Sequence, residues 1–140
     1  MEIGTVERGK PMKGIVLTTD EKMFVKDFAA PLHESLGEAV GKAVGGYIEV
    51  VHPRGLDRPY CFVCNEEGLL MDLPLNIMGS LWYGTLEHGH PIVGNIVVLK
   101  QDMTDDGHDI VGLEEDDIRK IKQIVDDTSG GRIRDVDENV

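Results

Sequence analysis

The sequence predicts a single α+β domain in which a mainly antiparallel sheet of four to five strands packs against two main helices and one short helix. Short runs rich in β-branched residues, separated by turns that contain glycine or proline, indicate the strands. Longer segments with apolar residues at every third or fourth position indicate helices with one buried face. A chain of 140 residues is also the size of one domain and can bury a hydrophobic core.

The first third of the chain predicts one strand and one helix. Residues 15–19 indicate a strand, and residues 20–30 indicate a connector with a short turn of helix around Phe24 and Phe28. The helix is predicted to begin at Pro31, because the missing N–H costs nothing at a first helical position, and to end at Gly45-Gly46. Its buried face is formed by apolar residues four positions apart with two alanines beside them: Leu32, Leu36, Val40 and Val44, and Ala39 and Ala43.

The middle of the chain predicts strands joined by tight turns. Residues 47–52 and 60–64 are β-branched or aromatic runs of strand length. Residues 65–68, Asn-Glu-Glu-Gly, are expected to form the turn of a hairpin into residues 69–71. Apolar residues on one face of residues 74–83 predict the short helix, although Gly79 weakens it.

The last third predicts the central strand and the second main helix. Residues 92–99 form the most apolar run of the chain, which is typical of a strand in the middle of a sheet. Residues 101–109 are expected to be a polar loop, and Ile110-Val111 could add a short strand. Residues 113–127 predict an amphipathic helix whose first turn is acidic and whose basic residues follow, the order that the helix dipole favours.

The predicted boundaries divide the chain into three parts. Residues 1–11 carry little pattern and are expected to form a leader, and the domain is expected to cover residues 12–128. Residues 129–140 combine two adjacent glycines with alternating charge and few apolar side chains. Because such a segment has little to bury, we predict a mobile acidic tail there.

The charge of the chain is strongly acidic, with 14 basic and 26 acidic side chains and a formal net charge of −12. Residues 101–140 hold 13 of the acidic and 5 of the basic side chains. A surface of this sign repels phosphate groups, which disfavours direct binding of nucleic acid. An acidic segment can keep a protein soluble or can imitate nucleic acid toward a basic protein, and we favour the first interpretation.

Compartment and cofactors follow from what the sequence lacks. No apolar run approaches the roughly 20 residues that span a bilayer, and the polar start is unlike a signal peptide, so we expect a cytoplasmic protein with no membrane partner. The two cysteines are too few for a disulfide framework and are expected to be reduced. The phosphate-binding patterns GxGxxG and GxxxxGK[ST] do not occur, and we expect no cofactor.

Four residues could in principle hold a metal ion: Cys61 and Cys64, with His88 and His90. Sulfur and imidazole are the ligands that Zn²⁺ prefers. The surroundings of the cysteines are typical of a strand, however, and residues three apart in a strand point to opposite faces. We therefore favour packing over metal binding for the cysteines, and exposed turn positions for the histidines.

Several short motifs together resemble the family called domain of unknown function 3846, small proteins often found in phages, plasmids and other mobile elements of bacteria. The resemblance covers residues 12–118 and rests on five segments in matching order: 45–51 (GGYIEVV), 65–68 (NEEG), 73–76 (LPLN), 81–84 (LWYG) and 88–95 (HGHPIVGN). The family has no agreed activity or catalytic residues, so the resemblance implies no reaction.

Polar residues within these motifs mark where a ligand would bind: Asn65, Glu66, Asn76, His88 and His90. A side-chain amide both donates and accepts hydrogen bonds, so the two asparagines could contact a ligand. Asparagine also commonly caps helices and stabilises turns, and we favour that role for both.

The sequence thus predicts a small accessory module without catalytic residues that binds a protein or a small ligand, with an unknown oligomeric state. Sequestration of a small signalling molecule and inhibition of a basic host protein through the acidic C-terminal region are its concrete forms. The alternative is a small metal-dependent hydrolase that uses His88 and His90. Stoichiometric zinc, or a pocket that joins a cysteine to the histidines, would favour the hydrolase.

Overall fold

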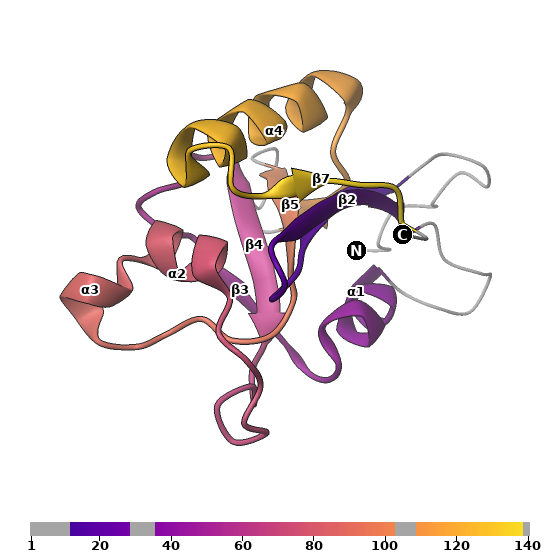
Figure 1. Ribbon diagram of the computed structural model, residues 1–140. Helices are drawn as coiled ribbons and strands as arrows, with labels where there is room; N and C mark the ends of the chain where they lie inside the picture. Colours follow the sequence, from indigo (N-terminus) through magenta and orange to yellow (C-terminus); the bar gives the residue numbers. More distant parts are fainter. Residues whose placement is uncertain (1–11, 29–35, 103–108, 139–140) are drawn as a thin grey trace.

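The computed structural model describes residues 12–28, 36–102 and 109–138. Within them the chain forms one seven-stranded sheet with helices on both faces (Figure 1). The strands are β1 Lys13–Leu17, β2 Lys22–Asp27, β3 Ile48–Val51, β4 Tyr60–Asn65, β5 Ile96–Asp102, β6 Asp109–Val111 and β7 Arg134–Asp135. The helices are α1 Leu36–Val44, α2 Ile77–Tyr83, α3 Thr85–His88 and α4 Glu115–Ser129.

The order of the strands in the sheet is β3-β4-β5-β1-β2-β7, and β6 pairs with the far end of β5. Every pairing is antiparallel except that of β2 with β7. The central position predicted for the most apolar run is confirmed, because β5 lies between β4 and β1 and Ile96, Val97 and Val98 are completely buried. Among the described strands, β3, β6 and β7 each pair with one strand only and leave open edges of the sheet.

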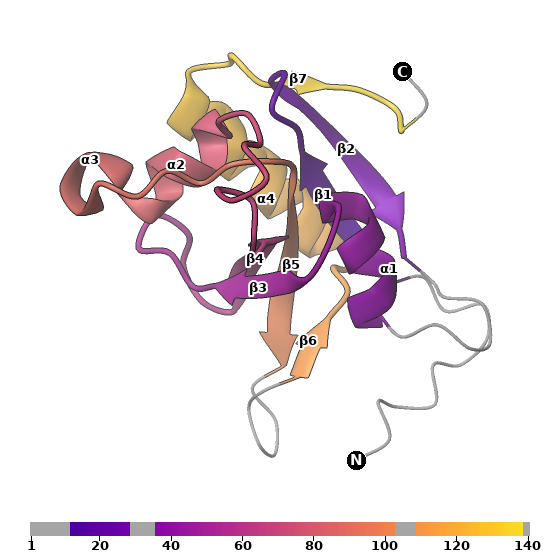
Figure 2. The same ribbon diagram turned by 90° about the horizontal axis from the view of Figure 1, so that it is seen from below.

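The sheet separates two hydrophobic cores, because side chains alternate between the faces of a strand. Helix α1 covers one face, and α2 and α4 cover the other (Figure 2). Val40 and Val44 of α1 pack with Val63 and Val97 of the sheet. On the opposite face Trp82 of α2 belongs to a second core, whose α4 members are Ile118, Ile121 and Val125.

The predicted mixture of helices and antiparallel strands is confirmed, but the number of elements is larger than predicted. The described residues contain seven strands and four helices instead of four to five strands and three helices. The additional elements are β2, β7 and α3. None of the four helices that the structure describes is long and apolar enough to cross a membrane.

The helical turn predicted around Phe24 and Phe28 is wrong. This segment is β2, which forms a hairpin with β1 in the register Val16↔Phe24 and Leu17↔Met23. Residues 24 and 28 are four apart, a spacing that fits one face of a strand as well as one face of a helix. Both phenylalanines pack against the α1 side of the sheet, so alternation and not helical periodicity explains the spacing.

The hairpin strand predicted at residues 69–71 is also wrong. Gly68 N donates to Asn65 O at 3.2 Å, and Leu73 N donates to Gly68 O at 3.1 Å, so the chain turns twice between β4 and α2. The apolar side chains of Leu69, Leu70 and Met71 are exposed instead of packed on a sheet. The sequence pattern did not separate exposed from buried leucine, because both occur in apolar runs.

Several predicted element bounds shift while the elements remain. The strand predicted at 92–99 begins at Ile96 and continues to Asp102, because residues 92–95 turn to meet the loop before α2 through the bridge Leu75↔Val93. The predicted start of α1 at Pro31 lies outside the described residues. The helices predicted at 74–83 and 113–127 are α2 and α4, each starting two or three residues later.

The segment predicted to be a mobile tail is placed against the sheet as far as residue 138. Ser129 ends α4, β7 lies parallel to β2, and Val136 N donates to Met23 O at 2.8 Å. This pairing was missed because β7 has only two residues, both exposed and charged. Mobility of the segment stays a prediction, as does the leader at residues 1–11, which lies outside the described residues.

Candidate functional site

Among the sequence-predicted site residues, the two asparagines make hydrogen bonds inside the fold. Asn76 is completely buried. Its Oδ1 accepts from Gly79 N at 2.9 Å and caps α2, while its Nδ2 donates to Leu17 O and Gly94 O, each at 3.0 Å. Both amide hydrogens are therefore used inside the fold. The favoured capping role of Asn76 is supported by these contacts.

Asn65 is the last residue of β4 and is almost completely buried. Its Nδ2 donates to Val44 O at 3.1 Å at the end of α1, and its Oδ1 accepts from Glu67 N at 2.8 Å within the turn. Its Nδ2 also lies 3.4 Å from the sulfur of Met71. Asn65 thus joins α1, β4 and the following turn, and little of the amide is left for a ligand.

The other three candidates are Glu66, His88 and His90, and the structure describes the side chains of Glu66 and His90 only. Glu66 and His90 are exposed. Glu66 N donates to Tyr47 O at 2.8 Å, and His90 O accepts from the Thr85 hydroxyl at 2.9 Å, so both are fixed through their main chain. His88 is the last residue of α3, and its side chain lies outside the description. No contact joins these side chains into one site within the described residues.

The two cysteines lie on opposite faces of the sheet, as strand alternation predicts. Cys64 belongs to the core beneath α2 and α4, whereas its strand neighbour Val63 belongs to the core beneath α1, the side that Cys61 shares by alternation. Burial raises the pKa of the Cys61 thiol to about 11, and burial together with the charge of Glu49 raises that of Cys64 to about 11. The described residues contain no group of three His, Cys, Asp or Glu side chains that could hold a metal ion.

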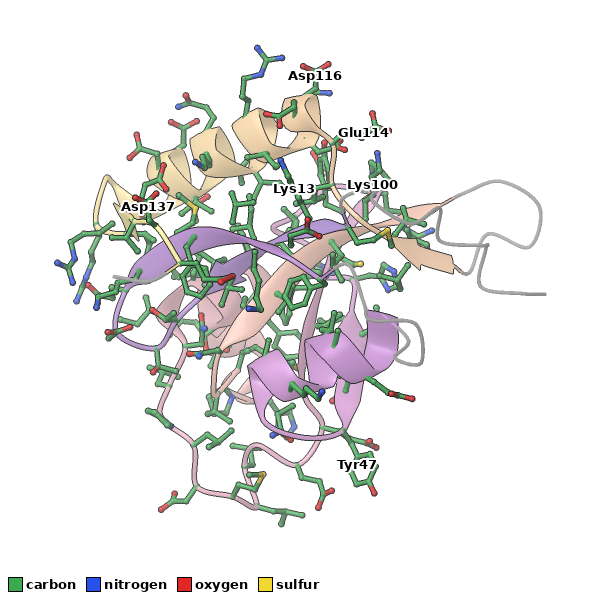
Figure 3. All side chains as sticks on the ribbon, turned by 90° about the vertical axis from the view of Figure 1, so that its right-hand side faces the viewer. Lys13, Tyr47, Lys100, Glu114, Asp116 and Asp137 are labelled. Atoms are coloured by element: carbon green, nitrogen blue, oxygen red, sulfur yellow. The ribbon has the colours of Figure 1, made fainter. Side chains whose placement is uncertain are left out.

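A buried polar cluster that the sequence analysis missed lies where α4 begins, and it consists of Tyr60, Lys100 and Asp117. The Tyr60 hydroxyl donates to Asp117 Oδ1 at 2.8 Å, and Lys100 Nζ lies 2.8 Å from Asp117 Oδ2. Glu114 N also donates to Asp117 Oδ2 at 2.8 Å, which caps the helix. Figure 3 shows Lys100 beside Glu114 at this end of α4. The pairing of Tyr60 with Lys100 on β4 and β5 could not be read from the sequence.

Electrostatics identify this cluster as an anchor of α4 and not as an activated group. Burial would raise the pKa of Asp117, but the hydrogen bonds from Lys100, the Glu114 main chain and Tyr60 together lower it. Burial, followed by the hydrogen bond and the charge of Asp117, raises the pKa of Tyr60 to about 12. A tyrosine held in its protonated form beside a carboxylate is a poor base near neutral pH.

Exposed apolar side chains form the second feature that the sequence analysis missed. Six of the eight large hydrophobic side chains that are exposed in the described residues lie between β4 and β5. We call them the apolar surface: Leu69, Leu70, Met71, Leu75, Leu81 and Leu86. Leu70 is 85% exposed and Leu86 is 99% exposed. A sequence signal for it does exist, since no Lys or Arg occurs between Arg58 and Lys100 in a chain with 29% charged residues.

The remaining two exposed hydrophobic residues, Tyr47 and Val50, belong to the edge strand β3 and its start. Tyr47 is 73% exposed and lies at the end of the molecule that carries the 65–73 turns (Figure 3). Asn65 connects the two regions, since it contacts Met71 and immediately precedes Glu66, whose N–H bonds Tyr47. The Met71 part of the apolar surface is therefore linked to the open edge of the sheet through Asn65 and Glu66.

Five carboxylates of the described C-terminal region are paired with basic side chains. The ion pairs are Lys13–Glu115, Lys26–Glu138, Lys100–Asp117, Arg119–Asp116 and Lys122–Asp135. Exposed ion pairs contribute little stability, but they place positive groups among the carboxylates. A continuous strip of unpaired negative charge, which imitation of nucleic acid would need, is thus interrupted along this region.

The fold and these features define a small mixed α/β domain whose buried polar side chains serve the fold and whose exposed large apolar residues are concentrated in one segment. The family described as Domain of unknown function (DUF3846) matches residues 12–126. The chain belongs to this family, as its motifs predict. No curated protein and no solved structure matches the chain.

Proposed function

We propose that this domain is a protein-binding module without catalytic activity and that the apolar surface is where its partner binds. The observation that carries the proposal is the concentration of exposed leucine and methionine between β4 and β5. Exposed apolar patches on folded domains commonly mark sites of protein interaction. The low charge of this segment fits the centre of such an interface, where charged residues are depleted.

A protein suits this surface better than a small molecule does. Leu86 is 99% exposed, so its own chain covers almost none of it. Small-molecule sites enclose most of their ligand, which requires concave surroundings. A protein surface can cover a protruding leucine from outside and gains roughly 25 cal/mol for each Å² of apolar area removed from water. The apolar surface therefore supports a protein partner over a sequestered signalling molecule.

The polar residues support a binding role without catalysis. Asn65 and Asn76 use their amide groups inside the fold, and in the Tyr60–Lys100–Asp117 cluster the carboxylate accepts hydrogen bonds from the other two side chains. Catalysis by acid and base needs groups that titrate near the working pH and reach a substrate. Action in the bacterial cytoplasm, and carriage by a phage or another mobile element, are parts of the same proposal.

Site-specific photo-crosslinking in cells of the source organism tests the proposal. A photo-reactive phenylalanine analogue replaces Leu70 in one variant and Gln123, an exposed residue of α4, in the control. We expect one discrete adduct from position 70 that position 123 does not form, and we expect Leu86→Glu to reduce it. Absence of an adduct at position 70, or the same adducts from both positions, contradicts the proposal.

A further inference from the structure

The outer edge of β3 carries main-chain groups that no strand of the described chain pairs. In the register Ile48↔Asn65, the bond from Glu66 N to Tyr47 O marks residues 47 and 66 as a hydrogen-bonded pair. Hydrogen-bonded pairs alternate along antiparallel strands, so the main chain of Glu49 also faces β4. The N–H and C=O groups of Ile48 and Val50 therefore point away from the sheet. These are the groups that an additional strand would bind.

The side chains beside this edge differ in character between the two faces of the sheet. Ile48 packs with the core beneath α1, and Val50 shares its face by alternation. Glu49 lies on the opposite face with Tyr47, is exposed, and has no ion-pair partner within the described residues. A strand placed next to β3 would meet apolar side chains on one face and a carboxylate on the other.

Charge decides between the possible occupants of the edge. No Lys or Arg occurs from residue 59 to 99, while Glu66 and Glu67 of the adjoining turn are exposed. A second copy of the chain brings another net charge of −12 and the same glutamate to the edge. Like charges opposed across strands are destabilising, whereas opposite charges stabilise the pair. The edge thus favours a basic strand over a second copy.

We propose that the partner adds an extended segment to β3 and that this segment alternates basic with apolar residues. Its main chain bonds Ile48 and Val50, its basic side chains lie beside Glu49, and its apolar side chains lie beside Val50. This inference rests on the proposed function, because the edge continues into the apolar surface through Tyr47 and Met71. Main-chain bonds give such an added strand its affinity, and the flanking side chains give it specificity.

Three synthetic peptides, each long enough to cover the four residues of β3, test this mode on the full chain. One alternates Lys with Val, the second alternates Glu with Val, and the third is the Lys–Val peptide methylated at alternate main-chain nitrogens. We expect the first peptide to shift the amide resonances of Ile48 and Val50. We expect the other two to bind at least about tenfold more weakly, because they lose charge complementarity or hydrogen bonds.

Substitutions in the chain give the matched controls. Glu49→Lys should reverse the preference between the Lys–Val and Glu–Val peptides. Val50→Pro removes an N–H that faces outward and is compatible with an edge strand, so it should keep β3 paired with β4 and weaken the Lys–Val peptide. If this variant fails to fold, the methylated peptide tests the same hydrogen bonds on the unaltered chain.

The edge proposal is overturned if the methylated peptide binds as well as the unmodified one, if the resonance shifts lie away from β3, or if no peptide binds. A dimer of the full chain that Val50→Pro dissociates in sedimentation would assign the edge to a second copy. An undiminished adduct from position 70 in the Val50→Pro variant would overturn the strand mode and leave the proposed function intact. Absence of that adduct in the unaltered chain would contradict the proposed function itself.

Discussion

Two regions of this domain depart from the usual rule that polar side chains are exposed and apolar side chains are buried. At the start of α4, the polar groups of Tyr60, Lys100 and Asp117 lie inside the fold and satisfy one another. Between β4 and β5, apolar side chains such as Leu70 and Leu86 lie outside it in water. The polar groups are costly to disturb because each would lose a partner in a buried place. The apolar groups cost the fold almost nothing to change.

The difference suggests where function is to be sought in a chain whose sequence points to no particular reaction. Polar residues are the usual candidates for a functional site because they can bind ligands or take part in catalysis. In this domain, however, the amide groups of Asn65 and Asn76 bridge parts of the fold and cap a helix. Exposed leucine has no comparable structural duty. The exposed leucines are therefore free to meet a partner, and substitutions in the two regions should separate stability from binding.

The largest effect is expected from Asn76→Asp. Asn76 donates two hydrogen bonds to the carbonyl oxygens of Leu17 and Gly94, and an aspartate would turn a carboxylate oxygen toward them. Repulsion in a completely buried place should lower the free energy of unfolding by about 3–5 kcal/mol, as measured by urea denaturation.

Asn95→Asp is the matched control for that substitution. Asn95 only accepts, through Oδ1 from Thr19 N at 3.1 Å, and aspartate keeps that acceptor. This variant should change stability by less than about 1 kcal/mol. Equal losses in the two variants would show that Asn76 is not the bridge that its contacts indicate.

The buried thiols should resist modification strongly. Burial raises the pKa of both Cys61 and Cys64 from 9.0 to about 11, which leaves about a hundredfold less thiolate at a given pH below both values. A disulfide-exchange reagent at pH 8 should therefore react about a hundredfold or more slowly with the folded chain than with the chain in urea. Rapid reaction of either thiol in the folded chain would contradict its placement on the buried strand β4.

A pH dependence of intermediate size is expected from Tyr60. Its pKa in the folded state, about 12, lies above its ordinary value of 10.0. The stabilisation is therefore fully present below pH 10 and is lost as the pH rises through 12. We expect this loss to reach roughly 2 kcal/mol relative to Tyr60→Phe, which lacks the ionisable hydroxyl.

Asp117 should give the free energy of unfolding the opposite dependence on pH, in the acid range. Its pKa is lower in the folded state, so its contribution is present above the unfolded value and is lost as the pH falls through the folded value. Urea denaturation across pH with Tyr60→Phe and Asp117→Asn separates the alkaline loss of stability due to Tyr60 from the acid loss due to Asp117. Parallel profiles for Tyr60→Phe and the unaltered chain above pH 10 would show that the cluster does not hold α4.

What could be predicted from the sequence depended on whether local pattern or distant pairing decides an element. The end of α1 at Gly45, the central β5 and the amphipathic α4 carry their own periodicity or capping signal, and all were predicted. Strand β7 is two exposed charged residues that exist as a strand only because β2 lies beside them. Helical spacing and strand alternation agree at residues four apart, which is why Phe24 and Phe28 were assigned wrongly.

The candidate site shows the same distinction between features that a local pattern determines and features that distant pairing determines. The capping role of Asn76 was favoured because asparagine commonly caps helices, although the helix was predicted to begin at residue 74. The separation of Cys61 from Cys64 followed from alternation within one strand. The Tyr60–Lys100–Asp117 cluster joins residues up to 57 positions apart and needs the sheet register to be recognised. Exposure of Leu70 and its neighbours depends on two turns whose bonds no periodicity predicts.

The smallest effect on stability, and the sharpest test of the comparison, is expected from Leu70→Glu combined with Leu86→Glu. Both side chains are more than four-fifths exposed, so their replacement removes little buried area and should change the free energy of unfolding by no more than about 0.5 kcal/mol. The same double variant should lose the adduct formed from an adjacent position such as Leu69, because two charges would enter the apolar contact. If Leu70 and Leu86 do not contact a partner, the double variant will form the adduct unchanged. If they stabilise the fold, the double variant will have a lower urea midpoint. Loss of binding at unchanged stability is the combination that only a partner-facing surface produces.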